Sequence, residues 1–339
     1  SVPIISHRNI YPLTTYMINT NMKPCILPWI NFSTNPYGRS RTCGYSDLSI
    51  VKQNKSIKHS TINSEWNNDY FSTIRRDFLE GNWPENCKRC RYVEELGGVS
   101  KRMDENEAYY EQYKDLIEQT SPDGSISGGP KHIDIRTGTT CNQKCIHCGT
   151  GVSSKWREDK ELFDKYPNTQ TVHSDDRWID RDPRIWNHLR ENMHVFTRYN
   201  FLGGESFANK MHNQYLTDLC ESPYAKNIEL QYVTNGVLLT EKRLEQLSKF
   251  KYVKLRLSVD APGPAGEYFR FPMNWLEFTE KSKMVNDYIS GRDNFDVVFQ
   301  WTCSNISIFY LSDMYPMLTD AYQNIKFIFS NHVEFPLHM

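Results

Sequence analysis

Apolar runs, several of them alternating with polar positions, recur along the chain after residue 130 and predict six β-strands. These are Lys131–Thr137, Val195–Leu202, Ile228–Thr234, Tyr252–Val259, Asp296–Thr302 and Ile325–Ser330. Helical stretches lie between them, notably Phe207–Cys220, Glu241–Phe250 and Trp275–Ile289. Strands that alternate with helices pair in parallel through right-handed crossovers. The pattern therefore predicts an α/β fold, a partial and open (β/α)6 barrel with function at the carboxyl ends of its strands.

A turn-rich stretch divides the chain. Residues 121–130 read Ser-Pro-Asp-Gly-Ser-Ile-Ser-Gly-Gly-Pro and follow a helix-like segment, Asp104–Gln119. We therefore expect a small cysteine-rich domain with a connecting helix over residues 1–120, a linker over 121–130 and the barrel over 131–339.

Composition narrows the class of protein. Hydrophobic residues make up 38% and aromatic residues 13% of the 339 positions, which is enough for a core. The 40 basic and 41 acidic residues nearly cancel, which argues against a protein that binds a nucleic-acid partner over its whole surface. No apolar stretch approaches the length of a membrane span, and the N-terminus lacks a signal-peptide pattern. Nine cysteines, seven of them clustered, favour thiolate metal sites in a reducing cytoplasm over disulfides.

Three of these cysteines directly follow the first predicted strand. Cys141, Cys145 and Cys148 stand three and two residues apart on one loop, where three thiolates can reach a single inorganic centre. Structural zinc is the other interpretation, since spacing alone does not choose the metal. A structural zinc site closes with four ligands, and the nearest further candidates are His147 and His173.

The loop resembles the C-x3-C-x2-C signature of the radical S-adenosylmethionine (radical SAM) enzymes. This resemblance implies a [4Fe–4S] cluster that leaves one iron open to S-adenosylmethionine (SAM). His147 departs from the family pattern, where the residue before the third cysteine is usually aromatic and does not titrate; its backbone would contact the adenine.

Further matches to this family stand at the ends of the next strands, in order. Gly203-Gly204-Glu205 resembles the motif that holds the amino group of SAM, and Ser258-x-Asp260 resembles the element that contacts the ribose and the carboxylate. The resemblance extends the cofactor-binding set to Thr234, Asn235, Arg256 and Thr302. Arg256, Ser258 and Asp260 alternate and should project from one face, where Arg256 would pair with the carboxylate of SAM or serve as a structural charge.

A second cysteine group precedes the barrel. The segment from Cys25 to Cys43 reads as two strands joined by a turn, which would bring these two cysteines together, and Cys87 and Cys90 form a compact pair. Four thiolates suit a fully ligated cluster or structural zinc. The segments resemble the twitch and SPASM auxiliary modules of radical SAM enzymes, which implies a second [4Fe–4S] cluster. These modules usually follow the barrel; the reversed order resembles a twitch-containing group common in phage and bacterial genomes.

The resemblance implies reductive cleavage of SAM to a 5′-deoxyadenosyl radical, which abstracts hydrogen from a substrate, and an electron donor such as flavodoxin or ferredoxin. We expect an oxidoreductase or maturase that acts on a peptide or protein side chain. One alternative is a dehydrogenase or epimerase of a small sugar or nucleotide metabolite, for which Cys303 would be the hydrogen-atom donor. A zinc-stabilised binding protein without enzymatic activity is the alternative of another class.

Overall fold

The computed structural model describes residues 22–47, 56–166 and 177–332, which fall into two compact units. The first unit comprises Ser1–Ile30, Tyr45–Gln53 and Asn67–Gly128. The second comprises Asn31–Gly44, Asn54–Trp66 and Gly129–Met339. The last boundary lies inside the predicted linker, but two N-terminal segments join the unit that contains the barrel strands instead of staying with residues 1–120.

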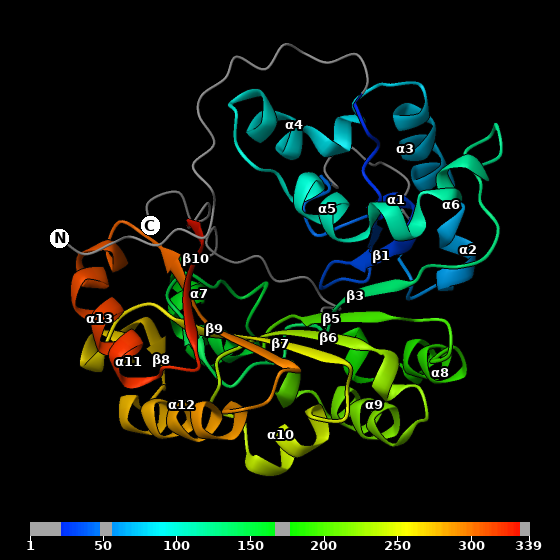
Figure 1. Cartoon of the computed structure of the whole chain (residues 1–339). Helices are drawn as coiled ribbons and strands as arrows, with labels where there is room; N and C mark the ends of the chain where they lie inside the picture. Colours follow the sequence, from blue (N-terminus) through cyan, green and yellow to red (C-terminus); the bar gives the residue numbers. More distant parts are fainter. Residues whose placement is uncertain (1–21, 48–55, 167–176, 333–339) are drawn as a thin grey trace. The chain divides into compact units, whose positions relative to one another are not determined.

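An eight-stranded, mostly parallel sheet forms the second unit, in the order β10-β9-β7-β6-β5-β3-β1-β2 (Figure 1). Its strands are β1 (Asn31–Thr34), β2 (Ser40–Arg41), β3 (His132–Arg136), β5 (Arg198–Leu202), β6 (Glu229–Thr234), β7 (Tyr252–Val259), β9 (Phe295–Cys303) and β10 (Lys326–His332). All six predicted strands are present and pair in parallel, as expected of a partial barrel. A separate pair joins β4 (Lys144–Cys145) to β8 (Arg270–Phe271), antiparallel.

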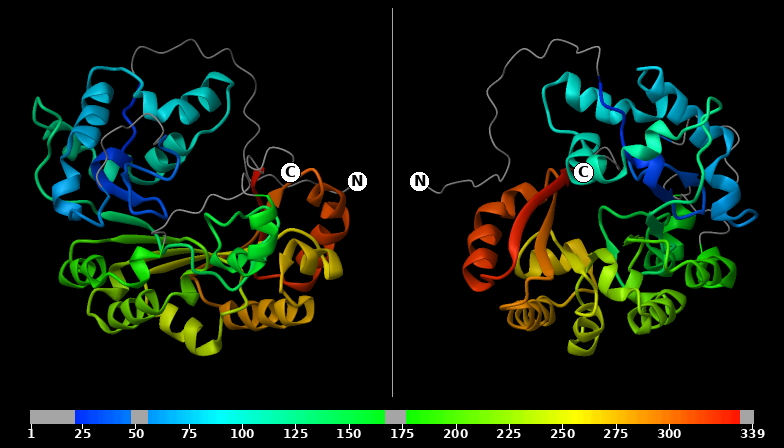
Figure 2. Two further views of the ribbon diagram at one scale, coloured as in Figure 1. Left: turned by 180° about the vertical axis from the view of Figure 1, so that it is seen from behind. Right: turned by 45° about the vertical axis from the view of Figure 1, so that its right-hand side comes forward.

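Helices cover one face of this sheet, with α8, α9, α10 and α12 lying along it in each view (Figures 1 and 2). The helices of the second unit are α2 (Ile62–Trp66), α7 (Lys160–Lys165), α8 (Pro183–Glu191), α9 (Lys210–Glu221), α10 (Glu241–Leu247), α11 (Gly263–Phe269), α12 (Trp275–Ile289) and α13 (Leu311–Ala321). Short 3-10 helices are η2 (Ser154–Asp159), η4 (Trp178–Asp180), η5 (Ser206–Ala208), η6 (Ala225–Asn227) and η7 (Ser307–Tyr310). Asn209, Thr240 and Asn274 cap α9, α10 and α12, and their side chains accept a backbone N–H in the first turn.

Alternation gives the sheet an apolar and a polar face. In β7, Val253, Leu255, Leu257 and Val259 are buried, whereas the residues between them are partly exposed. The same alternation runs through β5 and β6. Since successive side chains of a strand point to opposite faces, the helices pack on the apolar face and leave the polar residues on the other.

The first unit is helical. Its helices are α1 (Leu27–Ile30), α3 (Asp69–Leu79), η1 (Glu85–Cys87), α4 (Lys88–Glu95), α5 (Lys101–Tyr113) and α6 (Asp115–Glu118). Arg75 is fully buried there and donates to the carbonyl oxygens of Pro28 (2.9 Å) and Gly124 (3.2 Å). Burial lowers the pKa of Arg75 to about 9, so these hydrogen bonds compensate a charge removed from water.

One prediction for the N-terminal segment needs correction. Residues 27–30 form a helical turn rather than the start of a strand, and Pro28 stands in its first turn, where a missing N–H is tolerated. The hairpin itself is present as β1 and β2. Within the described residues, no helix is both long and apolar enough to cross a bilayer.

Candidate active site

The cysteine loop that follows β3 is held from two sides. On one side, β4 pairs with β8, which places Cys145 opposite Arg270. On the other side, the indole of Trp156 donates to the carbonyl oxygen of Cys145 (3.0 Å), and the N–H of Cys141 donates to Ser154 (3.3 Å). The backbone of the loop is therefore held by strand pairing on one side and by two side chains of η2 on the other.

The loop carries one buried cysteine, Cys145, and two partly exposed ones, Cys141 and Cys148. The Sγ atoms of Cys145 and Cys148 and one ring nitrogen of His147 lie within 4.8 Å of one another. Cys141 lies close enough to influence the ionisation of both other thiols electrostatically. Burial raises the pKa of the Cys141 thiol to about 11, although the N–H of Gln143, which donates to its sulfur (3.5 Å), lowers this pKa. Thiols that burial keeps protonated become thiolates when a metal supplies the compensating charge, so this group suits an inorganic centre.

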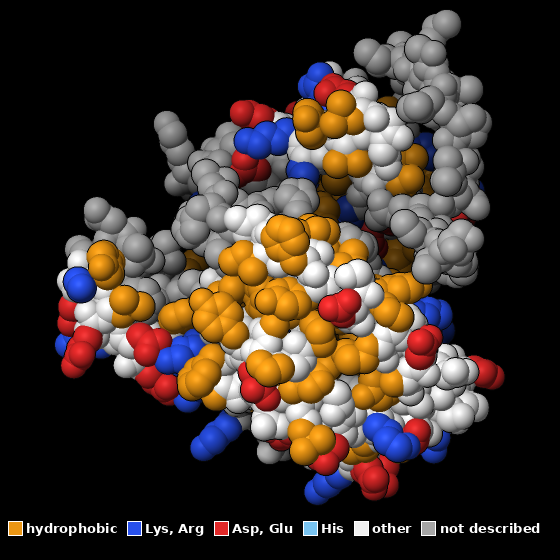
Figure 3. Space-filling model, turned by 90° about the vertical axis from the view of Figure 1, so that its left-hand side faces the viewer, with side chains coloured by type: hydrophobic (Ala, Val, Ile, Leu, Met, Phe, Trp, Pro, Cys, Tyr) orange, Lys and Arg blue, Asp and Glu red, His pale blue; other side chains and the backbone are white. Residues whose placement is uncertain are grey.

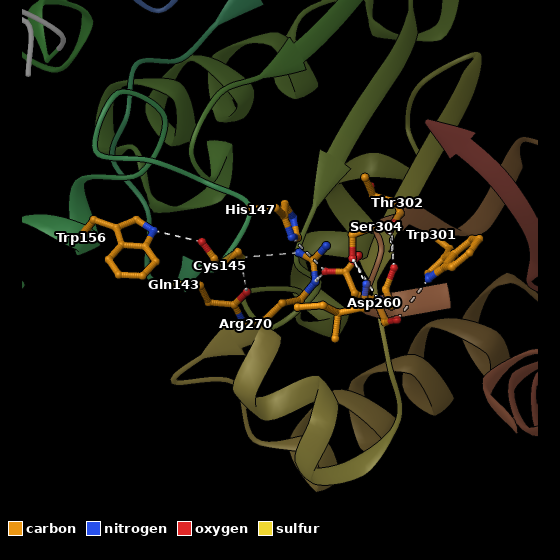
Figure 4. A network of polar contacts seen from close by, with 11 residues as sticks. Gln143, Cys145, His147, Trp156, Asp260, Arg270, Trp301, Thr302 and Ser304 are labelled. Atoms are coloured by element: carbon orange, nitrogen blue, oxygen red, sulfur yellow. Dashed lines mark hydrogen bonds and ion pairs between the residues drawn. The ribbon is translucent and has the colours of Figure 1, made fainter. Parts of the chain in front are cut away.

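A buried ion pair adjoins the thiols (Figure 4). The Arg270 and Asp260 side chains are 7% and 1% exposed, and Arg270 Nε lies 2.8 Å from Asp260 Oδ2. Arg270 Nη1 also lies 3.8 Å from the Sγ of Cys145, so the guanidinium stands between a carboxylate and a thiol. Although burial lowers the pKa of Arg270, Asp260 and Cys145 raise it above its usual value, which keeps the guanidinium charged.

Arg270 was not predicted from the sequence. Its local pattern, a charged residue between Phe269 and Phe271, gives no sign of a contact with a residue 125 positions earlier. His147, which was predicted to face the cofactor, has its Nδ1 3.7 Å from Asp260 Oδ2. Burial lowers the pKa of His147 although Asp260 opposes this, so the ring is neutral near pH 7.

The two glycines after β5 pack against the cysteine loop. A Cβ on Gly203 would lie 2.9 Å from the carbonyl oxygen of Gly138, and one on Gly204 would lie 2.5 Å from that of Thr140. The N–H of Gly204 donates to Gly138 (3.1 Å), and that of Glu205 donates to Thr140 (2.8 Å). Only glycine allows this approach, so the motif positions the loop directly.

Glu205 is buried and its carboxylate is engaged within the protein. It accepts hydrogen bonds from Thr234 Oγ1 (2.9 Å), the N–H of Asn235 (2.9 Å) and the N–H of Phe207 (3.1 Å). Asn235 in turn donates to Asn142 Oδ1, inside the cysteine loop, at 2.7 Å. Glu205, Thr234 and Asn235 thus tie the ends of β5 and β6 to the loop; a direct contact of these residues with SAM stays a prediction.

The other predicted site residues lie along β7 and β9. Arg256 and Ser258 share the polar face of β7, and Ser258 is the cross-strand neighbour of Gln300. Thr302 follows Gln300 by two residues and shares its face, whereas alternation places Cys303 on the side of Trp301. A role of Cys303 as hydrogen-atom donor stays a prediction.

The predicted auxiliary cysteines divide between the units. Cys87 ends η1 and Cys90 lies in the first turn of α4, in the unit that also contains Cys25. Cys43 belongs to the second unit. A shared site for the four thiols therefore stays a prediction, and His173, the other histidine considered for zinc, lies outside the described residues.

Polar contacts join two helices of the first unit. Glu94 accepts hydrogen bonds from Ser100 (2.5 Å) and from Arg102 (2.5 Å), and the Arg102 guanidinium lies 5.2 Å from the Trp83 ring. These contacts join α4 to the start of α5 and so fix the helix that carries Cys90.

Comparison with known proteins finds a family model that matches part of the barrel. Residues 135–298 match the family model described as the radical SAM superfamily. Over this stretch, just under half of its length, the chain is similar to radical SAM proteins. It is also similar to the radical SAM cyclopropyl synthase TigE of Paramaledivibacter caminithermalis, with 26% identity over 57% of the chain. The chain spans only 42% of the length of that relative.

Two solved structures are similar at lower identity. Native anSMEcpe with bound AdoMet matches at 18% identity, covering 61% of this chain and 52% of that one, with a TM-score of 0.42. Streptococcus suis SuiB bound to precursor peptide SuiA matches at 13% identity, covering 81% and 58%, with a TM-score of 0.41.

Proposed function

We propose that this chain is a radical SAM enzyme that takes a hydrogen atom from a peptide or protein side chain. The observation that supports the proposal is the close approach of Cys145 and Cys148, with Cys141 on the same loop after β3. The loop lies among the residues that match the family model and beside the buried guanidinium of Arg270. Three thiols and no fourth cysteine on this loop match a cluster with one open iron better than a closed zinc site.

The residues present fit a cluster with SAM. Cys141, Cys145 and Cys148 would hold a [4Fe–4S] cluster, and Asp260 keeps one buried oxygen, Oδ1, without a hydrogen-bond partner among the described residues. When bound, the cluster and SAM supply reductive cleavage to a 5′-deoxyadenosyl radical, the species that abstracts hydrogen.

The protein's own residues then have separable tasks. Arg270 places positive charge beside the Cys145 thiolate, which favours added negative charge there. Asp260 offers its unpartnered oxygen to a donor on the ligand, and the neutral ring of His147 adds no charge to the site. The buried position of Cys145 limits access of water to the chemistry.

Exposed aromatic side chains near the cysteine loop favour a peptide as the substrate. Tyr268 is 69%, Phe271 54% and Phe309 78% exposed. Phe271 is the cross-strand neighbour of Lys144, and η7, which contains Phe309, packs on α11 through Tyr310 and Phe269. Figure 3 shows hydrophobic side chains gathered over one face of the molecule. Aromatic rings with such exposure offer contact area to the side chains of a peptide.

The proposal includes a second [4Fe–4S] cluster at Cys25, Cys43, Cys87 and Cys90, and a one-electron donor such as flavodoxin or ferredoxin in a reducing cytoplasm. The second cluster would accept or relay the electron that leaves the substrate radical. Structural zinc at the four cysteines is the competing outcome.

The test is anaerobic reconstitution with iron and sulfide, followed by an assay of 5′-deoxyadenosine with dithionite and SAM. About eight irons per chain with product supports the whole proposal, and about four irons with product replaces the second cluster by zinc. Zinc at both sites without product overturns it.

Cysteine variants locate the two sites. Cys145→Ala should abolish 5′-deoxyadenosine formation and keep the N-terminal metal, whereas Cys87→Ala should remove about half of the iron. The matched control is Cys220→Ala, because Cys220 is buried in α9 on the apolar face and should keep full metal content. Product from the Cys145→Ala protein would contradict the assignment of the loop.

A further inference from the structure

Four polar side chains at one edge of the sheet each have a buried atom that lacks a hydrogen-bond partner among the described residues. They are Ser33, Arg41, Asp134 and Arg136, which we call the edge cluster. Ser33 and Asp134 are cross-strand neighbours on β1 and β3, and Ser33 and Arg41 are cross-strand neighbours on β1 and β2. Arg136 follows Asp134 by two residues, so all four side chains share one face of the sheet.

That face is the polar one, opposite the helices. Asp134 is the cross-strand neighbour of Asn200, and Asn200 that of Gln231. The intervening residues Ile133 and Phe201 point to the other face and are buried under the helices. The edge cluster thus extends the polar, inner face of the partial barrel.

Each member of the edge cluster has a buried atom without a hydrogen-bond partner among the described residues. These atoms are Ser33 Oγ, Arg41 Nε, Asp134 Oδ1 and Arg136 Nε. Ser33 is 0% and Asp134 7% exposed, so these atoms are removed from bulk water. Buried polar atoms are nearly always paired in folded proteins, so four of them together indicate a group that binds there.

The charges indicate which kind of group. Two guanidinium groups face one carboxylate, and within the described residues no ion pair involves Arg41, Asp134 or Arg136. The three groups still act on one another: burial lowers the pKa of Arg136, Asp134 opposes this, and Arg41 adds to it. Arg41 already donates from its terminal nitrogens to the carbonyl oxygens of Gly44 (3.1 Å) and Thr34 (3.4 Å), so the unused donors are its Nε and the guanidinium of Arg136. An excess positive charge with these unused donors is the complement of an anion.

The edge cluster also lies near the start of the cysteine loop. Arg136 is the last residue of β3, and the loop that it begins reaches Cys141 five residues later. Its backbone N–H donates to Thr34 Oγ1 (3.2 Å), and the N–H of Thr137 donates to Leu202 (2.6 Å), which fixes this strand end between β1 and β5. A ligand bound here would lie at the carboxyl end of the strand from which the cysteine loop starts.

We infer that the peptide substrate carries a carboxylate that binds the edge cluster, with its oxygens accepting hydrogen bonds from Arg41 and Arg136. An N–H of the peptide beside that carboxylate would donate to Asp134 Oδ1, and Ser33 would complete the contacts. This inference rests on the proposed function, because it names the substrate class of the same site. The carboxylate can come from an acidic side chain or from the C-terminus of the peptide.

The test measures binding of three synthetic peptides to the reconstituted full chain by saturation-transfer NMR. The probes are acetyl-Ala-Glu-Ala-amide, acetyl-Ala-Gln-Ala with a free C-terminal carboxylate, and acetyl-Ala-Gln-Ala-amide, which has no carboxylate. At least one acid should bind about ten-fold tighter than the amide, as expected for a charge-assisted hydrogen bond in a buried site. Whichever acid binds identifies the source of the carboxylate.

Variants locate the interaction. Arg136→Gln should remove the preference for the acid, because Arg136 contributes charge with little bonding to the protein itself. Ser33→Ala keeps both charges and should keep most of the preference. The matched control is Arg190→Gln, whose arginine pairs with Asp218 on the helical layer (2.6 Å) and should leave binding unchanged.

The outcomes separate the two claims. If the wild-type protein forms 5′-deoxyadenosine but binds all three probes equally, the inference is wrong and the proposed function stands. If the Arg136→Gln protein keeps its preference for the acid, the inference is also wrong. If the acid is preferred and no 5′-deoxyadenosine forms, the carboxylate site stands and the proposed function falls.

Discussion

Replacing Gly204 with alanine tests whether the glycines after β5 position the cysteine loop. A Cβ at this residue would lie 2.5 Å from the carbonyl oxygen of Thr140 and 2.7 Å from that of Thr139. Both are backbone atoms within two residues of Cys141, so the overlap cannot be relieved by rotating a side chain. The loop or the end of β5 has to move.

The cost can be worked out from these contacts. Overpacking of this kind destabilises a protein by about 1–3 kcal/mol. A shift of the loop also strains the hydrogen bonds from Gly204 to Gly138 and from Glu205 to Thr140, each worth about 1 kcal/mol. We therefore expect a loss of about 2–4 kcal/mol in the free energy of unfolding and a Tm lower by roughly 5 °C.

The assay combines thermal unfolding with the iron content after anaerobic reconstitution. Gly149→Ala is the matched control, because Gly149 directly follows Cys148 but a Cβ there meets no atom within 4 Å. Gly204→Ala should lower both the Tm and the iron bound at the loop, whereas Gly149→Ala should change neither. Equal Tm and iron content in the two variants would refute the claim that packing of Gly204 sets the position of the cysteines.

Three further predictions concern residues around the loop. Arg270→Gln removes a guanidinium 3.8 Å from Cys145 Sγ and should lower the midpoint potential of the cluster by about 50–100 mV in an EPR-monitored titration. Arg270→Lys keeps the charge, so its potential should stay within about 30 mV of the wild-type value. Equal potentials in the two variants would contradict the electrostatic role. Asn235→Ala removes the 2.7 Å bond to Asn142 and should speed iron loss to a chelator about five-fold; an unchanged rate would show that the bond does not hold the loop. Burial lowers the pKa of His212 to about 3, below its value in the unfolded chain, so on acidification the unfolded state gains a proton that the folded state does not. The free energy of unfolding measured in urea should therefore fall by about 2 kcal/mol between pH 6.5 and 5. His212→Gln should flatten this slope, and identical slopes would count against it.

The strands were predictable because their signal is local. β7 alternates buried and partly exposed residues over its whole length, and a parallel order follows from the helices between strands. The pairing of β1 with β3 was not predictable, since Ser33 and Asp134 are about a hundred residues apart and the hairpin pattern does not state which strand it joins. Long-range pairing depends on the whole sheet, whereas a hairpin depends on its own turn.

The candidate site likewise has features that the sequence predicts and features that depend on long-range pairing. Its thiols were predictable from cysteine spacing, but the contact of Arg270 with Cys145 depends on the pairing of β4 with β8, two strands of two residues each. Such short strands carry no periodic pattern. Glu205 was predicted to contact the cofactor, but nothing in its sequence showed that Thr234 and Asn235 would supply donors to its carboxylate.

The balance of charge indicates why a cationic cofactor suits this site. Arg270 is a buried cation that already neutralises Asp260, and the two are 2.8 Å apart. Deprotonating the buried thiols of the loop adds negative charge, which is costly in a place of low dielectric constant unless cations enter with it. Iron would compensate part of that charge, and the sulfonium of SAM would compensate more. Removing Arg270 would therefore leave Asp260 as an uncompensated anion beside the thiolates. The net charge of the site would become more negative, and this would change the binding of the metal and of a cationic ligand even in a protein that folds correctly.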